Sequence, residues 1–289
     1  MDEIAVKALA KINLGLDVLR RREDGYHEVK MVMQTIHLCD SLTIRKADKG
    51  IHLTSNLSFL PANENNLAYR AAQLLMEEFH IEGGVEIHLE KRIPVAAGMA
   101  GGSTDAAGVL YGMNEMFSLG LKRTELMTRG VTLGADVPYC LMRGTALAEG
   151  IGEKLTSLPP MVKCPVLIAK PQVSVSTKYV YEHLQLNEDT RHPDIEGLIR
   201  AIKGKELNDI ASRMGNLLET VTVERYPEIA AIKDIMREQG ALNAMMSGSG
   251  PTVFGLFQDR KDAKRAASVL RSSGLTRQVF VTGIYNNRR

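Results

Sequence analysis

A run of small residues at positions 94–104, PVAAGMAGGST, has the composition of a phosphate-binding loop. Gly98, Gly101 and Gly102 allow the backbone to approach a ligand closely. A helix beginning after the run would point free N–H groups and the positive end of its dipole at that ligand. The run lacks the Gly-Lys-Ser/Thr ending of a Walker A loop and the glycine spacing of a dinucleotide-binding loop. It therefore predicts an anion site of another class, with a purely structural tight turn as the alternative.

The elements on either side of this run fit that prediction. Apolar and polar residues alternate over 85–90, which predicts a half-buried strand. Apolar residues then recur at helical spacing over 106–117. Ser103, Thr104 and Asp105 offer oxygens that can cap the start of this helix.

Two further positions carry groups suited to chemistry. Lys11 and Asn13 alternate with apolar residues along 12–18, which predicts a strand with both side chains on one face. A solvated sheet face is the alternative. Asp136 precedes Val137-Pro138, where it can cap a helix that opens at Val137 or present a free carboxylate.

The composition limits the class of protein. The chain has 289 residues, and 44% of them are hydrophobic, which is enough for a sizeable core and two domains. Pro159-Pro160 is the expected boundary between a domain of residues 1–158 and one of residues 159–289. A net charge of +2 gives no nucleic-acid-like bias. The three cysteines are far apart in the sequence, which predicts neither a disulfide framework nor a metal cluster and favours a reducing cytoplasm. The N-terminus resembles neither a signal peptide nor a membrane span.

The pattern of the remaining chain predicts a mixed α+β fold. Asp24-Gly25 marks a hairpin turn, and a helix is expected over 66–79. A second Gly-rich run, MSGSGPTVF at 246–254, leads into a strand. The other expected elements are strands at 166–169 and 279–284 and helices at 124–129, 195–202, 207–221, 227–239 and 262–271.

Three segments together resemble the motifs of the GHMP small-molecule kinases, in order and over nearly the whole chain. They are AKINLGLDVLRRREDGYHE at 10–28, PVAAGMAGGSTDAA at 94–107 and MSGSGPTVF at 246–254. LGADVPYC at 133–140 matches the pattern around the family's catalytic aspartate. The first segment is most similar to the branch that acts on a methylerythritol linked to cytidine diphosphate.

This resemblance implies a fold and an activity. The fold is a two-domain α+β kinase, with an N-terminal domain like ribosomal protein S5 domain 2, a C-terminal ferredoxin-like domain and the site in the cleft between them. The activity is ATP-dependent phosphorylation of a hydroxyl on the cytidine-diphosphate-linked substrate, giving a 2-phosphate in non-mevalonate isoprenoid precursor biosynthesis. ATP with Mg²⁺ would be the co-substrate of a cytoplasmic monomer or homodimer that binds neither nucleic acid nor membrane.

The resemblance also implies roles for individual residues. Asp136 corresponds to the general base and Lys11 to its charged partner, with no protein metal ligand. The substrate-binding positions are Asn13, Tyr26, His27, Thr177 and Tyr181. The ATP-binding positions are Asn66, Leu67, Lys91, Pro94, Val95, Ala96, Ala97, Gly98, Met99, Ala100, Gly101, Gly102, Ser103 and Thr104.

The chain departs from the family pattern in the middle segment. Met99 and Ala100 replace the usual Leu and Gly, and Asp105 replaces a usual Asn or Ser, so Asp105 is left out of the predicted site. The role of Gly248 and Gly250 beyond closing the site is left open.

Two alternative functions remain at this point. One is another GHMP kinase, of the mevalonate or homoserine type, which would have no use for Tyr26 and His27 as readers of cytosine. The other is an RNA-binding module, because the N-terminal fold is shared with ribosomal domains. Arg20, Arg21 and Arg22 favour it, whereas the near-neutral charge and 5% aromatic content do not.

Overall fold

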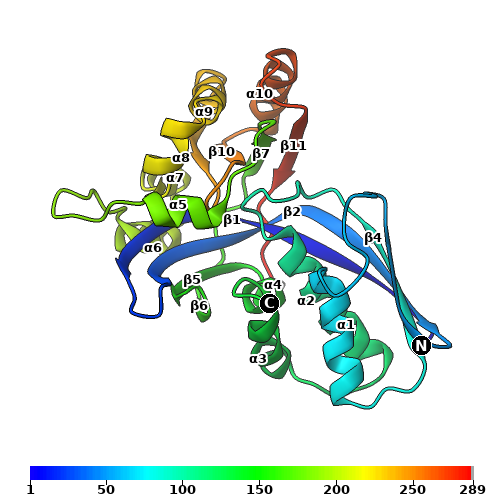
Figure 1. Ribbon diagram of the computed structural model, residues 1–289. Coiled ribbons are helices and arrows are strands. Elements are labelled where there is room, and N and C mark those ends of the chain that lie inside the picture. The colour runs from blue at the N-terminus through cyan, green and yellow to red at the C-terminus, as the bar shows by residue number, and fades with distance from the viewer. Residues whose placement is uncertain (288–289) are drawn as a thin grey trace. The chain divides into compact units, whose positions relative to one another are not determined.

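The computed structural model describes residues 1–287, which form two compact units (Figure 1). The strands β1 (Glu3–Arg21) and β2 (His27–Ala47) supply residues to both units. Unit 1 comprises Met1–Ala10, Leu38–Val95 and Ala100–Met142; unit 2 comprises Lys11–His37, Ala96–Met99 and the chain from Arg143 onward. The domain boundary expected at Pro159-Pro160 stays a prediction.

Unit 1 combines a small sheet with packed helices. The end of β2, residues 41–47, pairs antiparallel with β4 (Gly84–Glu90), and β4 pairs parallel with β3 (Gly50–Ser55). Helices α1 and α2 lie side by side (Figure 1), and α4 contacts both α2 and α3. The helices are α1 (Leu67–Glu78), α2 (Gly101–Met116), α3 (Arg123–Leu133) and α4 (Val137–Met142).

Small residues let α2 approach the strands closely. A Cβ at Gly112 would lie 2.7 Å from Ile44 Cδ1, and one at Gly108 would lie 3.1 Å from Leu42 Cδ1. Because protein interiors are close-packed, larger residues at these two positions would displace the helix. The packing of α2 on β2 thus fixes where the loop before α2 ends.

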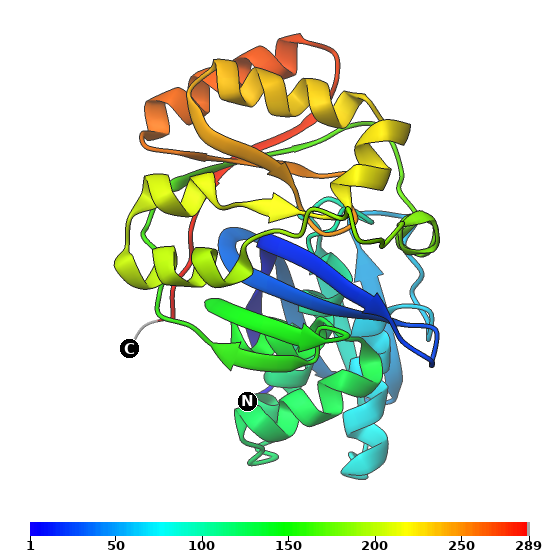
Figure 2. The same ribbon diagram turned by 90° about the vertical axis from the view of Figure 1, so that its left-hand side faces the viewer.

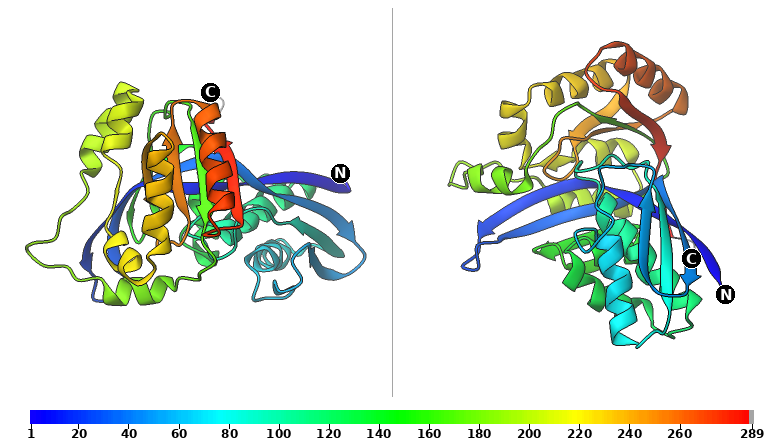
Figure 3. Two further views of the ribbon diagram at one scale, coloured as in Figure 1. Left: turned by 90° about the horizontal axis from the view of Figure 1, so that it is seen from above. Right: turned by 45° about the vertical axis from the view of Figure 1, so that its right-hand side comes forward.

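Unit 2 contains an antiparallel four-stranded sheet in the order β11-β7-β10-β9. Helices α9 and α10 cover one face of this sheet, as Figure 3 shows. The chain order β7, α9, β9, β10, α10, β11 is the split βαβ arrangement of ferredoxin-like folds, so this prediction is confirmed. These elements are β7 (Pro165–Lys170), α9 (Glu228–Glu238), β9 (Ala241–Met246), β10 (Val253–Phe257), α10 (Arg260–Ser272) and β11 (Gln278–Gly283).

The rest of unit 2 surrounds the segments that β1 and β2 contribute to it. Residues 29–34 of β2 pair with β5 (Thr145–Gly150), which pairs with β6 (Lys154–Ser157). The chain then runs through several helices and the short strand β8, a stretch that Figure 2 shows in colours from green to yellow. These are α5 (Thr177–His183), α6 (Ile195–Gly204), α7 (Leu207–Ser212), β8 (Gly215–Asn216) and α8 (Glu219–Arg225).

One expected element is wrong. The helix expected over 207–221 is divided into α7, β8 and α8. Gly215 and Asn216 have low helix propensity, and they pair in parallel with Gly15 and Leu16 of β1 instead. The strands β3, β5, β6 and β9 were not expected from the pattern, whereas the predicted α+β class is confirmed. Within residues 1–287 no helix is both long and apolar enough to cross a membrane.

Candidate active site

The helix after the first Gly-rich loop begins earlier than the sequence predicts. Helix α2 opens at Gly101, and Ala100 occupies the N-cap position, where no side chain caps the helix within the described residues. Thr104 Oγ1 donates instead to the carbonyl of Leu9 at 2.8 Å. The expectation that Ser103, Thr104 or Asp105 caps this helix was therefore wrong, because all three lie inside its first turns.

Two alanines of this loop have left-handed backbone conformations. Ala96 has a φ of 50° and Ala100 a φ of 57°, a region in which glycine carries no steric cost. An alanine there costs about 1 kcal/mol or more, and such strain tends to gather at functional sites. Ala100 thus keeps the backbone conformation that glycine favours, although it carries a Cβ.

The middle of the loop packs against the second Gly-rich segment. Ser247 Oγ donates to the carbonyl of Gly98 at 2.9 Å. Gly98 has a φ of 71°, and a Cβ on it would overlap the carbonyl oxygen of Ser247. A Cβ on Gly248 would lie 3.3 Å from Gly98 Cα. The two segments therefore lie too close for a side chain on Gly98.

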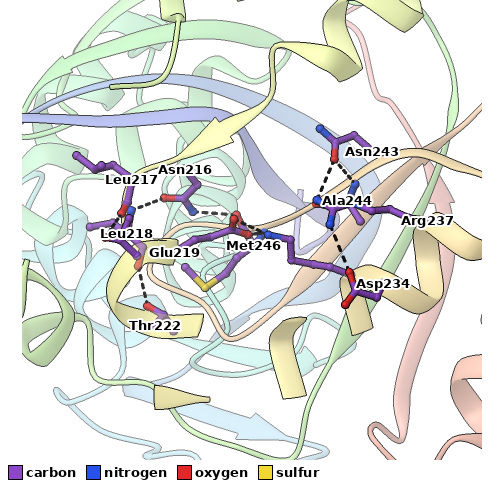
Figure 4. A network of polar contacts seen from close by, with 12 residues as sticks. Asn216, Leu217, Leu218, Glu219, Thr222, Asp234, Arg237, Asn243, Ala244 and Met246 are labelled. Carbon is purple, nitrogen blue, oxygen red and sulfur yellow. Dashed lines mark hydrogen bonds and ion pairs between the residues drawn. The ribbon is translucent and has the colours of Figure 1, made fainter. Parts of the chain in front are cut away.

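Asn216 is hydrogen-bonded to the second Gly-rich segment (Figure 4). Its amide Nδ2 donates to the carbonyls of Met246 at 2.9 Å and Gly248 at 2.8 Å. Glu219 accepts from the backbone N–H of Met246 at 2.7 Å and pairs with Lys233. Sequence analysis missed Asn216 and Glu219, since both fall where it expected one continuous helix.

Lys11 and Asn13 lie together as predicted. Lys11 Nζ donates to Asn13 Oδ1 at 2.7 Å, and Asn13 Nδ2 contacts Met31 Sδ at 3.5 Å. Lys11 is 5% exposed and Asn13 is fully buried, which contradicts a solvated sheet face. A Cβ on Gly248 would lie 3.7 Å from Asn13 Oδ1, so this polar pair adjoins the second Gly-rich segment.

Asp136 is half-buried and immediately precedes α4. Its backbone carbonyl accepts from the N–H of Cys140 at 3.0 Å, so a helix does open at Val137 as predicted. Asp136 belongs to unit 1 and Lys11 to unit 2, and their pairing stays a prediction.

Lys91 lies in a buried cluster with two carboxylates. Its Nζ contacts Asp40 Oδ2 and Asp105 Oδ2, both at 2.5 Å. Asp40 Oδ1 also accepts from the backbone N–H groups of Arg92 and Ile93. A Cβ on Gly101 would lie 3.5 Å from Lys91 Nζ, so the ammonium group sits directly beneath the start of α2.

When both carboxylates are ionised, the two carboxylates and one ammonium give the cluster an excess negative charge. Burial raises the pKa of Asp105 to about 7, with Asp40 adding to the rise and Lys91 opposing it. Burial alone would lower the pKa of Lys91, but the two aspartates outweigh it and the pKa is raised. Asp105 Oδ1 is buried and has no hydrogen-bond partner within the described residues.

Asn66 and Leu67 lie at the start of α1. Asn66 Oδ1 accepts from the N–H of Ala68 at 3.0 Å, and its Nδ2 donates to the carbonyl of Pro61. A Cβ on Gly102 would lie 3.6 Å from Leu67 Cδ1. The structure thus brings Leu67 close to the first turn of α2, while the Asn66 side chain serves as a helix cap.

Four of the five predicted substrate residues line one hollow in unit 2. Its volume is about 440 Å³, and its lining includes Tyr26, His27, Thr177 and Tyr181. The rings of His27 and Tyr181 pair with centroids 5.0 Å apart, whereas Tyr26 is 61% exposed. Asn13 is not part of this lining.

Thr177 links this hollow to the second Gly-rich segment. Its Oγ1 is 2.7 Å from Ser249 Oγ, in a hydroxyl pair where either group can donate. Ser249 was not predicted, although it lies in the motif MSGSGPTVF. The structure therefore connects Thr177, Ser249 and Gly98 through one segment.

Comparisons with known proteins identify the family of this chain. Models of the GHMP kinase N-terminal and C-terminal domains match residues 66–144 and 194–275. A 4-diphosphocytidyl-2-C-methyl-D-erythritol kinase of Lachnospira eligens is 58% identical over 98% of both chains. A crystal structure of a 4-(cytidine 5'-diphospho)-2C-methyl-D-erythritol kinase has a TM-score of 0.85 and 35% identity, covering 98% of this chain and 100% of the other. A homoserine kinase structure from Cytophaga hutchinsonii, at 22% identity and TM-score 0.80 with 100% and 96% covered, shows the fold alone. The chain belongs to the GHMP kinase family, in the group of the 4-diphosphocytidyl-2-C-methyl-D-erythritol kinases.

Proposed function

We propose that this protein uses ATP to phosphorylate a hydroxyl of 4-diphosphocytidyl-2-C-methyl-D-erythritol, giving the 2-phosphate. The observation that carries the proposal is the 58% identity to a kinase of that name over almost the full length of both chains. The hollow beside the His27–Tyr181 ring pair supports it, because a planar base fits a site with aromatic walls.

We propose that loop 94–104 holds the phosphates of ATP. The start of α2 supplies N–H groups that no side chain caps within the described residues, and a Cβ on Gly102 would meet only Leu67 within 4 Å, which leaves room there for close approach. Mg²⁺ would accompany the nucleotide, since it is usually held by phosphate oxygens, water and at most one or two carboxylates.

For the chemical step, we propose Asp136 as the general base for the substrate hydroxyl and Lys11 as its charged partner. Phosphoryl transfer depends on positioning and on neutralising the charge that spreads over the equatorial oxygens. A buried lysine fixed by Asn13 suits that role, because its ammonium group has little freedom to move.

On the substrate side, we propose that His27 hydrogen-bonds an edge of the cytosine while Tyr26 and Tyr181 stack on its ring. Stacking of this kind is worth about 1–3 kcal/mol per base. The exposed Tyr26 would then become covered when the substrate binds.

The choice of substrate can be tested directly. We expect ADP release in a coupled assay with the cytidine-linked substrate, and at least about a hundredfold lower kcat/KM with mevalonate or homoserine, which cannot fill the base hollow. Comparable turnover of either alternative would overturn the proposed substrate. Salt-dependent RNA binding without kinase activity would favour the RNA-binding alternative.

The phosphate loop can be tested at Gly98. Gly98→Ala adds a Cβ that overlaps the carbonyl of Ser247 and strains a φ of 71°, so the loop must shift. Because hydrogen bonds to charged groups are worth about 1.5–3 kcal/mol, we expect about a tenfold or greater loss of affinity for a non-hydrolysable ATP analogue, measured by calorimetry.

Gly204→Ala is the matched control, because a Cβ there meets no atom within 4 Å and the φ is not left-handed. Unchanged analogue affinity in folded Gly98→Ala would contradict the assignment of this loop.

A further inference from the structure

Arg20 and Arg21 end β1 and Arg22 follows directly, and the three arginines differ in their partners. Arg20 Nε pairs with Glu28 at 2.5 Å, and Arg22 pairs with Asp24 at 2.8 Å. Arg21, between them, forms no ion pair or side-chain hydrogen bond within residues 1–287. Its guanidinium is therefore the one charge of this run that no carboxylate neutralises.

The unpaired charge of Arg21 lies beside the proposed substrate-binding residues. It lines the 440 Å³ hollow with Tyr26 and Thr177, and also a second hollow of about 350 Å³ with Leu19 and Leu184. His27 and Tyr181 line both hollows, so their ring pair stands between them. Arg21 thus lines both hollows together with the His27–Tyr181 ring pair.

We propose that Arg21 is a positioning residue for substrate recognition: its unpaired guanidinium disfavours a second positive charge on His27 and keeps that imidazole neutral. This inference rests on the proposed function, in which His27 reads cytosine. A neutral imidazole has one nitrogen that can accept from the exocyclic amino group of cytosine, whereas an imidazolium can only donate.

The electrostatics of His27 agree with this role. Burial lowers the pKa of His27, and the positive charge of Arg21 lowers it further. The other titratable or charged side chains that line the two hollows are Arg20, Tyr26, Lys178, Tyr181 and Glu182, and Glu28 pairs with Arg20. Arg20 and Lys178 each have a carboxylate partner, Glu28 and Glu182 respectively, so Arg21 supplies the uncompensated charge.

Arg21→Met tests the inference because it keeps much of the length of the side chain and removes the charge. We expect the His27 ring signals, followed by NMR from pH 5 to 9 at low salt and assigned with His27→Gln, to titrate at higher pH than in the wild type. The KM for the cytidine-linked substrate should then rise between pH 8 and pH 6, by at most about fourfold if the pKa returned to its ordinary value near 6.5. The wild type should show a smaller rise.

Two further variants separate charge from structure. Arg21→Lys keeps the charge and should restore the wild-type titration. The double variant Arg20→Met with Glu28→Gln removes an arginine together with its counter-charge and should leave the titration unchanged. Thermal unfolding of each variant reports any structural loss separately.

An unshifted His27 titration in Arg21→Met would overturn the inference, and so would a shifted titration with no change in the pH profile of KM. The first result does not bear on the proposed function. The second would also count against His27 as the reader of cytosine, whereas the substrate comparison with the wild-type enzyme tests the proposed reaction separately.

Discussion

Replacing Asp136 with Asn should lower kcat by about a hundredfold or more, with KM for ATP nearly unchanged. The substitution keeps the size of the side chain and removes the carboxylate that would accept the proton of the substrate hydroxyl. General-base catalysis is worth about 10²–10⁴-fold, and a group that acts only in the transition state changes kcat rather than binding. Steady-state kinetics with the cytidine-linked substrate measures both constants.

Asp259→Asn is the control for this substitution. Asp259 also precedes a helix, α10, and makes no capping hydrogen bond within the described residues. It should turn over substrate at the wild-type rate. Normal kcat in Asp136→Asn would refute the assignment of the base.

The same measurement can test whether Lys11 and Asp136 act together. Lys11→Met should lower kcat on its own, and the double variant should be little worse than either single variant if the two groups serve one step. If the two residues acted independently, the fold losses in kcat of the single variants would multiply in the double variant. This double-mutant cycle measures the coupling between two residues that belong to different units.

Local signals in the sequence predicted much of the fold. Alternation and helical spacing predicted β4, α1 and α9 to within one or two residues, because each buries one regular face. The placement of Lys11 and Asn13 on one face followed from the two-residue period of a strand. These features depend on residues that are close to one another in the sequence.

Contacts between distant segments were not predictable in the same way. Pairing with β1 interrupts the expected helix at Gly215 and Asn216, and no local pattern signals a partner so far away along the chain. The hydrogen bond from Asn216 to the carbonyl of Met246 and the ion pair of Lys91 with Asp40 also join residues that are far apart in the sequence. Asp40 was missed because a lone aspartate within a strand has no spacing signal of its own.

Lys91 should be the most costly residue of the buried cluster to replace. Lys91→Met leaves the carboxylates of Asp40 and Asp105 without their cation, and breaking a buried ion pair costs about 3–5 kcal/mol of unfolding free energy. Urea unfolding measures the loss. Lys178→Met breaks an exposed pair with Glu182 and should change the unfolding free energy by at most about 1 kcal/mol.

Asp105→Asn should have the opposite effect, and the effect should depend on pH. The pKa of Asp105 is about 7 in the folded chain and about 3.9 when unfolded. Between these values the folded state holds a proton that the unfolded state has released, so the stability of the wild type falls as pH rises from about 4 to about 7 and levels off above.

The amide that Asp105→Asn introduces does not titrate, so the stability of this variant relative to the wild type should increase across that pH range. The amide oxygen can still accept from Lys91, and the cluster loses its excess negative charge. Urea unfolding at pH 5, 6, 7 and 8 should show the difference between the two proteins growing and then becoming constant above about pH 7.5. A difference that stays constant from pH 5 to 8 would mean that Asp105 remains ionised in the folded protein over that range. In that case the attraction of Lys91 would outweigh the burial of the carboxylate, and the cluster would keep its excess negative charge beneath the start of α2.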